Sequence, residues 1–105
     1  MKLGFAIRQV RMQLGMNQSE LAERCSITQT SLSQIERGNK NPSQKTLDKI
    51  CKELEVPVSL LYVLGMTEED VPMCRRAIYR QLFPSMMSLM KELIYEVEEE
   101  FAMAG

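Results

Sequence analysis

Residues 17–38 hold the side chains with the most specific chemistry in this chain of 105 residues. The sequence there predicts two short amphipathic helices, separated by about four residues. The second helix has small hydroxyl and amide side chains on its outer face. Such a helix can enter the major groove of DNA and offer hydrogen bonds to base edges. The stretch therefore indicates sequence-specific DNA binding rather than catalysis.

The sequence lacks the histidines and the closely spaced cysteine pairs that many catalytic and zinc sites use. There is no histidine, and Cys25, Cys51 and Cys74 lie far apart without a Cys-x-x-Cys pair. A zinc site and a Cys–His or Ser–His nucleophile are therefore not expected. We expect no enzyme activity, no metal and no cofactor, and we interpret the cysteines as reduced, mostly buried thiols. Only Cys74, close to a domain junction, is considered as a redox-sensing thiol.

The net charge of -1 hides an asymmetry along the chain. Residues 1–66 contain nine Lys and Arg against six Asp and Glu, whereas residues 67–105 contain four against eight. Attraction to phosphates depends on where the cations lie, so a basic head with an acidic tail is compatible with DNA binding. The longest apolar run, 60–64, is far too short to span a membrane, and no signal-peptide core is evident. We expect a soluble, cytoplasmic protein without membrane contact.

Apolar residues recur at helical spacing throughout, and no hairpin signal interrupts them. Gly15 and Gly38 suit helix ends, Asn17 and Glu20 suit a capping box, and Thr28 and Ser43 suit N-caps. The first part of the chain is predicted to form helices over 2–14, 18–24, 28–37, 44–54 and 58–64. Beyond residue 66 we expect a helix near 73–82 and a longer one near 85–102, because Pro84 disfavours the helical state at Phe83.

Linked residues spread over positions 3–64 carry a family resemblance. They are Arg11, Leu14-Gly15-Met16-Asn17-Gln18, Leu21-Ala22, Ile27, Ser31-Leu32-Ser33, Ile35-Glu36-Arg37-Gly38, Asn41-Pro42-Ser43, Thr46-Leu47, Ile50 and Val56-Pro57-Val58-Ser59-Leu60-Leu61. In this pattern the chain resembles the phage-repressor/Cro-like (Xre-type) helix-turn-helix family. The resemblance implies an all-α fold: a five-helix repressor-like DNA-binding bundle, here with a C-terminal helical extension. We expect a DNA-binding domain over residues 1–66 and the extension over residues 67–105.

The resemblance also implies roles for polar residues around the helix 28–37. Base edges would be contacted by Gln29, Thr30, Ser33 and Gln34, although any one of them could simply be solvated. Phosphate contact or support would come from Arg8, Asn17, Gln18, Thr28, Ser31, Arg37, Asn39 and Lys40. Gln18 could support the recognition helix, and Thr28 and Ser31 could cap it. Arg11 and Glu36 match a family ion pair with a structural role.

The extension contains an apolar stripe with an acidic opposite face. We predict that it pairs two copies of the chain through Met86, Met90, Leu93, Ile94, Val97 and Phe101. The alternative is that the last helix folds back on its own bundle and the chain stays monomeric. A methionine-rich stripe also suits a different protein partner.

These observations favour a dimeric repressor that binds double-stranded DNA through the helix 28–37. An antitoxin is an alternative, in which the tail binds a toxin while the head autoregulates the operon. A restriction-modification controller is another. The head has the same appearance in all three cases, so neighbouring genes would distinguish them.

Overall fold

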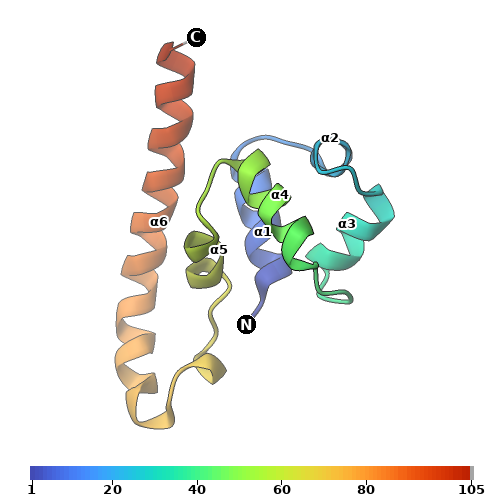
Figure 1. Cartoon of the computed structure of the whole chain (residues 1–105). Helices are drawn as coiled ribbons and strands as arrows, with labels where there is room; N and C mark the ends of the chain where they lie inside the picture. Colours follow the sequence, from blue (N-terminus) through green and yellow to red (C-terminus); the bar gives the residue numbers. More distant parts are fainter. Residues whose placement is uncertain (105) are drawn as a thin grey trace.

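A computed structural model describes the backbone of residues 1–104 and the side chains of residues 1–94, and it is helical (Figure 1). The expected all-α fold is confirmed. Its elements are α1 Leu3–Gln13, α2 Gln18–Arg24, α3 Gln29–Glu36, α4 Gln44–Leu54, α5 Val58–Leu64, the 3-10 turns η1 Glu68–Asp70 and η2 Met73–Arg75, and α6 Arg76–Ala104. Within the described residues, no helix combines the length and the apolar character that crossing a bilayer needs.

Side-chain caps start three of the helices where the sequence predicts them. Asn17 accepts a hydrogen bond from the Glu20 backbone N–H at 2.8 Å, and Thr28 accepts one from the Ser31 N–H at 3.0 Å. Ser43 caps α4 through the backbone N–H of Thr46 at 3.1 Å. A full capping box would also have the Glu20 carboxylate accept from the backbone N–H of Asn17. In the structure this carboxylate accepts from the side-chain amide of Asn17 instead. The caps fix where α2 and α3 begin, and so where their polar side chains lie.

A single apolar core holds α1 to α5 together. Its largest fully buried side chains come from all five helices and include Ile7, Leu21, Leu32, Ile50 and Leu61. Helix α1 lies directly on the end of α3 at Gly4, where an added Cβ would come within 1.8 Å of the Ile35 carbonyl oxygen. Any side chain at position 4 would therefore push α3 away from α1.

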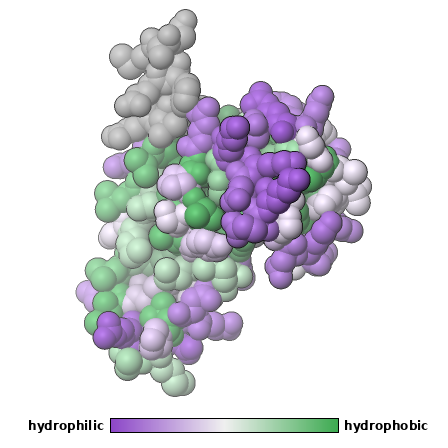
Figure 2. Space-filling view, viewed as in Figure 1, coloured by the Kyte–Doolittle hydropathy of each residue, from purple (hydrophilic) through white to green (hydrophobic). Residues whose placement is uncertain are grey.

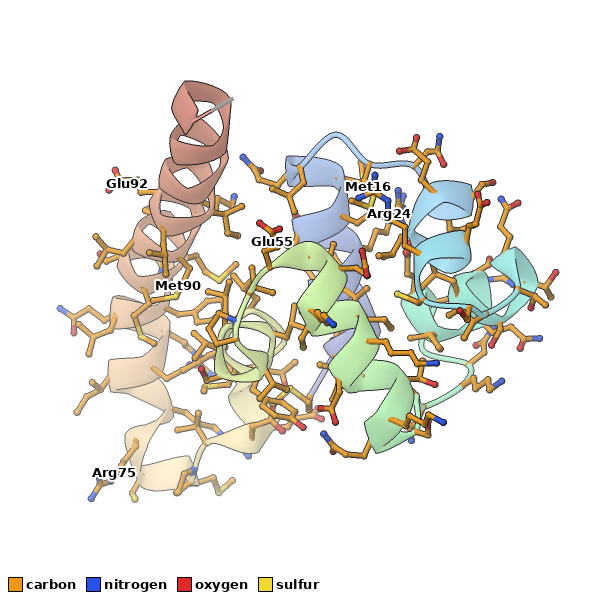
Figure 3. The ribbon with its side chains drawn as sticks, turned by 45° about the horizontal axis from the view of Figure 1, so that its top comes forward. Met16, Arg24, Glu55, Arg75, Met90 and Glu92 are labelled. Atoms are coloured by element: carbon orange, nitrogen blue, oxygen red, sulfur yellow. The ribbon has the colours of Figure 1, made fainter. Side chains whose placement is uncertain are left out.

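Helix α6 runs along one side of the bundle, next to α5 and α1 (Figure 1). Ile94 is buried in the core with 3% of its surface exposed, and Met87 and Met90 pack against that core. Figure 3 draws the side chains of α6 up to Ile94 and labels Met90 among them. The Tyr79 hydroxyl donates to the Met66 carbonyl at 2.9 Å. The extension is therefore joined to the bundle along the described part of its length.

The predicted helix break at Pro84 is wrong, because α6 continues through it. A proline inside a helix removes one backbone hydrogen bond and typically costs about 3 kcal/mol. Pro84 is exposed, so water can reach the carbonyl that loses its partner. The helix is held on both sides of the proline, by Tyr79 before it and by Met87 and Ile94 after it. Tertiary contacts therefore outweigh the local penalty.

The apolar stripe predicted for dimerisation is divided between two faces of α6. Ile94 lies in the chain's own core and Met90 packs against it, so these two residues do not face outward as expected. Met86 is half-buried and Leu93 is 45% exposed. The side chains of Val97 and Phe101 lie outside the described residues. The alternative of a helix folded back on its bundle therefore holds for the inner face of α6.

A second, exposed apolar stripe occupies the outer face of α6. It consists of Ile78, Leu82, Leu89 and Leu93, each between 45% and 61% exposed. Figure 2 shows hydrophobic side chains along the α6 side of the molecule and hydrophilic ones over the bundle. Glu92 projects away from the bundle in Figure 3. Nothing else in the described part of the chain covers this outer stripe.

Two of the three cysteines are buried, in line with the expectation of mostly buried thiols, and the third is exposed. Cys25 and Cys51 are free and buried, and Cys74 is free and exposed on η2. Burial is the main cause that raises the pKa of the Cys25 and Cys51 thiols above the ordinary value. These two thiols therefore behave as small apolar side chains.

Candidate nucleic-acid interface

Helix α3 lies on the side of the bundle away from α6 (Figure 1). Its inner residues Leu32 and Ile35 are buried in the core. On its outer side Gln29 and Thr30 are exposed, and Ser33 and Gln34 are half-buried. No described residue of the extension covers this outer edge, which is therefore open to solvent.

A buried ion pair fixes the far end of α3 to α1. Arg11 donates from Nε to Glu36 Oε2 at 2.8 Å and from Nη2 to Glu36 Oε1 at 2.9 Å, in a two-pronged arrangement. The Glu36 side chain is 2% exposed. The third Arg11 bond runs from Nη1 to the carbonyl oxygen of Met16, at the turn before α2, at 2.9 Å. In Figure 3 the label of Met16 shows where this turn lies, and the label of Arg24 shows the end of α2. The predicted structural role of the Arg11–Glu36 pair is confirmed.

Gln18 joins the same network from the first residue of α2. Its Nε2 donates to Glu36 Oε1 at 3.3 Å. Gln18 therefore supports the recognition helix, which is one of the two roles expected for it. Because α1, α2 and α3 all meet at Glu36, the network holds the three helices in one fixed relation.

Thr28, Ser31 and Lys40 make local contacts around α3. Thr28 is the N-cap of the helix, as one of its expected roles requires. Ser31 accepts a hydrogen bond from Lys40 Nζ at 3.1 Å, so the loop after α3 is tied back to the helix. Asn39 lies exposed in this loop and Asn17 is exposed at the α2 cap. Whether these side chains contact phosphates stays a prediction.

Two adjoining hollows open on the outer edge of α3. One, of about 260 Å³, is lined by Gln18, Gln29, Thr30, Ser33 and Arg37. The other, of about 270 Å³, is lined by Arg8, Arg11, Gln18, Ser33, Glu36 and Arg37. Arg8 and Arg37 are exposed. The structure thus brings three of the four predicted base-contacting residues to one hollow with an arginine beside them, while Gln34 lies outside that lining.

One side chain of this surface, Ser19, was not expected from the sequence. Its hydroxyl donates to Gln29 Oε1 at 2.9 Å, joining the second residue of α2 to the first of α3. No local pattern signals this contact, because serine is ordinary in the first turn of a helix. Within residues 1–94, no group of three or more His, Cys, Asp or Glu side chains could hold a metal ion.

Two curated relatives have sequences similar to the bundle. The transcriptional regulator ClgR of Mycobacterium tuberculosis is 34% identical over 61 residues, which are 58% of this chain and 54% of that protein. The control protein C.BamHI of Bacillus amyloliquefaciens is 42% identical over 60 residues, 55% of this chain and 74% of that protein. The chain spans about half the length of the first curated relatives it matches.

A solved structure extends the similarity beyond the bundle. The crystal structure of the clp gene regulator ClgR from Corynebacterium glutamicum matches with a TM-score of 0.62 and 28% identity, over 80% of this chain and 89% of that chain. A match of 80% is longer than residues 1–66, so it includes part of the extension.

The helix-turn-helix family model (HTH_3) matches residues 7–61, more than half of the chain and the whole of α2 and α3. Together with the buried core, the capped helices and the uncovered edge of α3, this match shows that the chain belongs to the helix-turn-helix family, in its Xre/Cro-like branch.

Proposed function

We propose that the protein is a sequence-specific regulator of transcription that binds double-stranded DNA and inserts α3 into the major groove. The observation that carries the proposal is the uncovered polar edge of α3, held rigidly by the network of Arg11, Glu36 and Gln18. A fixed edge of amides and hydroxyls can select bases because its donors and acceptors are placed before the DNA arrives. The relatives that are transcription regulators support the same function.

Cations near this edge supply the attraction to phosphates. Arg8 and Arg37 are exposed beside α3, and Lys40 lies in the loop that follows it. Contacts from these residues would set the register of the protein on the duplex without choosing its sequence. Binding should therefore weaken as salt rises. In a plot of the logarithm of the binding constant against the logarithm of the salt concentration, each phosphate contact should add roughly -1 to the slope.

Two copies of the chain would pair through the outer face of α6, which replaces the stripe expected from the sequence. The outer stripe lies on one face of the helix over roughly 22 Å, and its residues are spaced four, seven and four apart: Ile78, Leu82, Leu89 and Leu93. A second copy presents the same stripe, so a two-fold symmetric pair would cover both at once. A dimer of this kind would read two half-sites and repress a promoter that overlaps them.

Selection of bound DNA from a random pool tests the function most directly. We expect a recurring site with two related halves. Gln29→Ala and Thr30→Ala should each weaken binding to that site by about 1–3 kcal/mol and leave non-specific binding nearly unchanged. Gln44→Ala is the matched control, since Gln44 is the first residue of α4 as Gln29 is of α3. If both α3 variants bind the selected site as tightly as the unchanged protein, the placement of α3 in the groove is refuted.

A second candidate function is a restriction-modification controller. It is favoured by the similarity to the control protein C.BamHI and to the crystal structure of the restriction-modification controller protein C.Esp1396I. In that case a restriction or methylation gene should lie beside this one, whereas a small toxin gene would favour an antitoxin whose α6 binds the toxin. All three versions are DNA-binding proteins of the bacterial or phage-infected cytoplasm without catalytic activity, in keeping with a family of regulators and a sequence without histidine.

A further inference from the structure

The hydrogen bond between Ser19 and Gln29 connects the two helices of the DNA-reading unit outside the core. Ser19 is exposed on α2 and its hydroxyl donates to Gln29 Oε1 at 2.9 Å. Both helices have fixed starting points, because Asn17 caps α2 and Thr28 caps α3. The two partners are therefore presented to each other by rigid elements rather than by mobile loops.

The two ends of the Gln29 amide have opposite hydrogen-bonding character. The oxygen accepts hydrogen bonds, and the nitrogen donates two. Ser19 engages the oxygen, and no atom in the described part of the chain accepts from the nitrogen. The amide is thus held with its donor end free for a ligand.

We propose that Ser19 determines the base preference of Gln29 by holding its amide with the nitrogen toward the DNA. This inference rests on the proposed function and names what one residue of the site reads. A donor presented in the major groove suits the acceptors there: N7 of either purine, O6 of guanine and O4 of thymine. Cytosine presents an N4 amino donor instead. Gln29 held in this way disfavours cytosine at the base it contacts.

Ser19 acts through Gln29 and not by touching a base. The hollow of about 260 Å³ that faces outward is lined by Gln18, Gln29, Thr30, Ser33 and Arg37, and Ser19 is not part of that lining. Gln18 cannot replace it readily, because its own amide donates to Glu36. Ser19 is therefore a positioning residue with a single partner on α3. Without it, the Gln29 amide can turn over and offer its oxygen to cytosine.

Competition between operator variants tests the inference. DNA is first selected with the full chain. The base that Gln29 contacts is the position in this DNA at which the Gln29→Ala variant no longer prefers one base over the others. At that base we expect Ser19→Ala to reduce the discrimination against cytosine about fivefold, the effect of losing one ordinary hydrogen bond. Ser19→Thr keeps the hydroxyl and should keep the discrimination. Ser59→Ala is the matched control, because Ser59 is exposed and is the second residue of α5 as Ser19 is of α2.

A double-mutant cycle separates positioning from other roles. In the Gln29→Ala background, Ser19→Ala should have no further effect on binding to any operator variant. The inference is overturned if Ser19→Ala weakens operator binding equally in the unchanged protein and in Gln29→Ala. It is also overturned if Ser19→Ala discriminates against cytosine as strongly as the unchanged protein does. The regulator function stands in either case. A change of affinity without a change of base preference also overturns the inference. A full chain with no base preference at all refutes the proposed function and this inference together.

Discussion

Helices α3 and α6 both bury one face in the same core and leave the other open, but the open faces differ in chemistry. The free edge of α3 has amides and hydroxyls, including Gln29 and Thr30. The free face of α6 has an apolar stripe of leucine and isoleucine side chains, including Leu82 and Leu89. Base edges are recognised by hydrogen bonds, whereas apolar side chains gain free energy only when another apolar surface removes them from water. This difference fits the proposed function, in which DNA contacts α3 and a protein surface contacts α6.

The two helices also differ in how the core holds them. Helix α3 is fixed by an ion pair and an amide in addition to apolar packing, while α6 is held mainly by apolar contacts through Met87, Met90 and Ile94. Directed polar bonds fix an angle and a register more strictly than packing does. A helix that reads bases needs that strictness, and a helix that offers an apolar stripe needs it less.

The strongest way to break the comparison is to remove the polar anchor of α3. Glu36→Gln leaves the buried Arg11 guanidinium without its charged partner, so we expect the free energy of unfolding to fall by about 3–5 kcal/mol. Urea unfolding at fixed protein concentration measures this loss. Glu23→Gln on the exposed surface of α2 is the control. Equal stability of the two variants would mean that the anchor contributes nothing.

The two faces of α6 can be separated at neighbouring positions. Ile94→Ala opens a cavity in the core and should lower the free energy of unfolding by about 2–4 kcal/mol. Leu93→Ala removes a side chain that is 45% exposed and should change the stability of a single copy much less. Thermal unfolding of both variants at low concentration compares them. The division of the helix into an inner and an outer face fails if Leu93→Ala is the more damaging change.

Charging the outer stripe tests whether α6 pairs two copies. Leu82→Glu combined with Leu89→Glu should weaken dimerisation at least about 100-fold, because each lost side chain counts twice in a symmetric pair. Sedimentation equilibrium measures the effect. Met12→Glu is the control, since Met12 is a 56% exposed apolar residue on α1. A monomeric unchanged protein, or a dimer that survives the double change, would contradict the assignment.

The smallest expected effect concerns the junction before α6. A hydrogen bond from the Thr67 backbone N–H, followed by the Met1 amino group, lowers the pKa of Asp70. Such a carboxylate adds stability above its unfolded pKa and loses it as the pH falls through the folded pKa. Backbone amides of residues 66–71 should therefore lose protection against hydrogen exchange, measured relative to their intrinsic exchange rates, below roughly pH 4. In Asp70→Asn the exchange of these amides should depend less on acid pH. If its pH dependence is unchanged in this variant, other groups such as Glu68 cause it.

Local signals predicted the bundle well because the relevant interactions are close in sequence. The caps at Asn17, Thr28 and Ser43 each use a backbone N–H three residues on, so side-chain type and spacing suffice to place them. The Arg11–Glu36 pair joins residues 25 apart, and it was expected only through family resemblance. The Ser19–Gln29 bond was not expected at all, since nothing local distinguishes Ser19 from a solvated serine.

The sequence by itself determined the helices of the bundle, their starting points and the polar character of the edge of α3. Helical periodicity and capping depend on residues only a few positions apart, so they can be predicted from the sequence alone. Only the tertiary structure decided that α6 passes through Pro84 and which half of its wide apolar stripe enters the core. Both outcomes depend on contacts with residues outside the helix, in α1, in α5 and at Met66, and the free energy of those contacts outweighs what the local pattern favours.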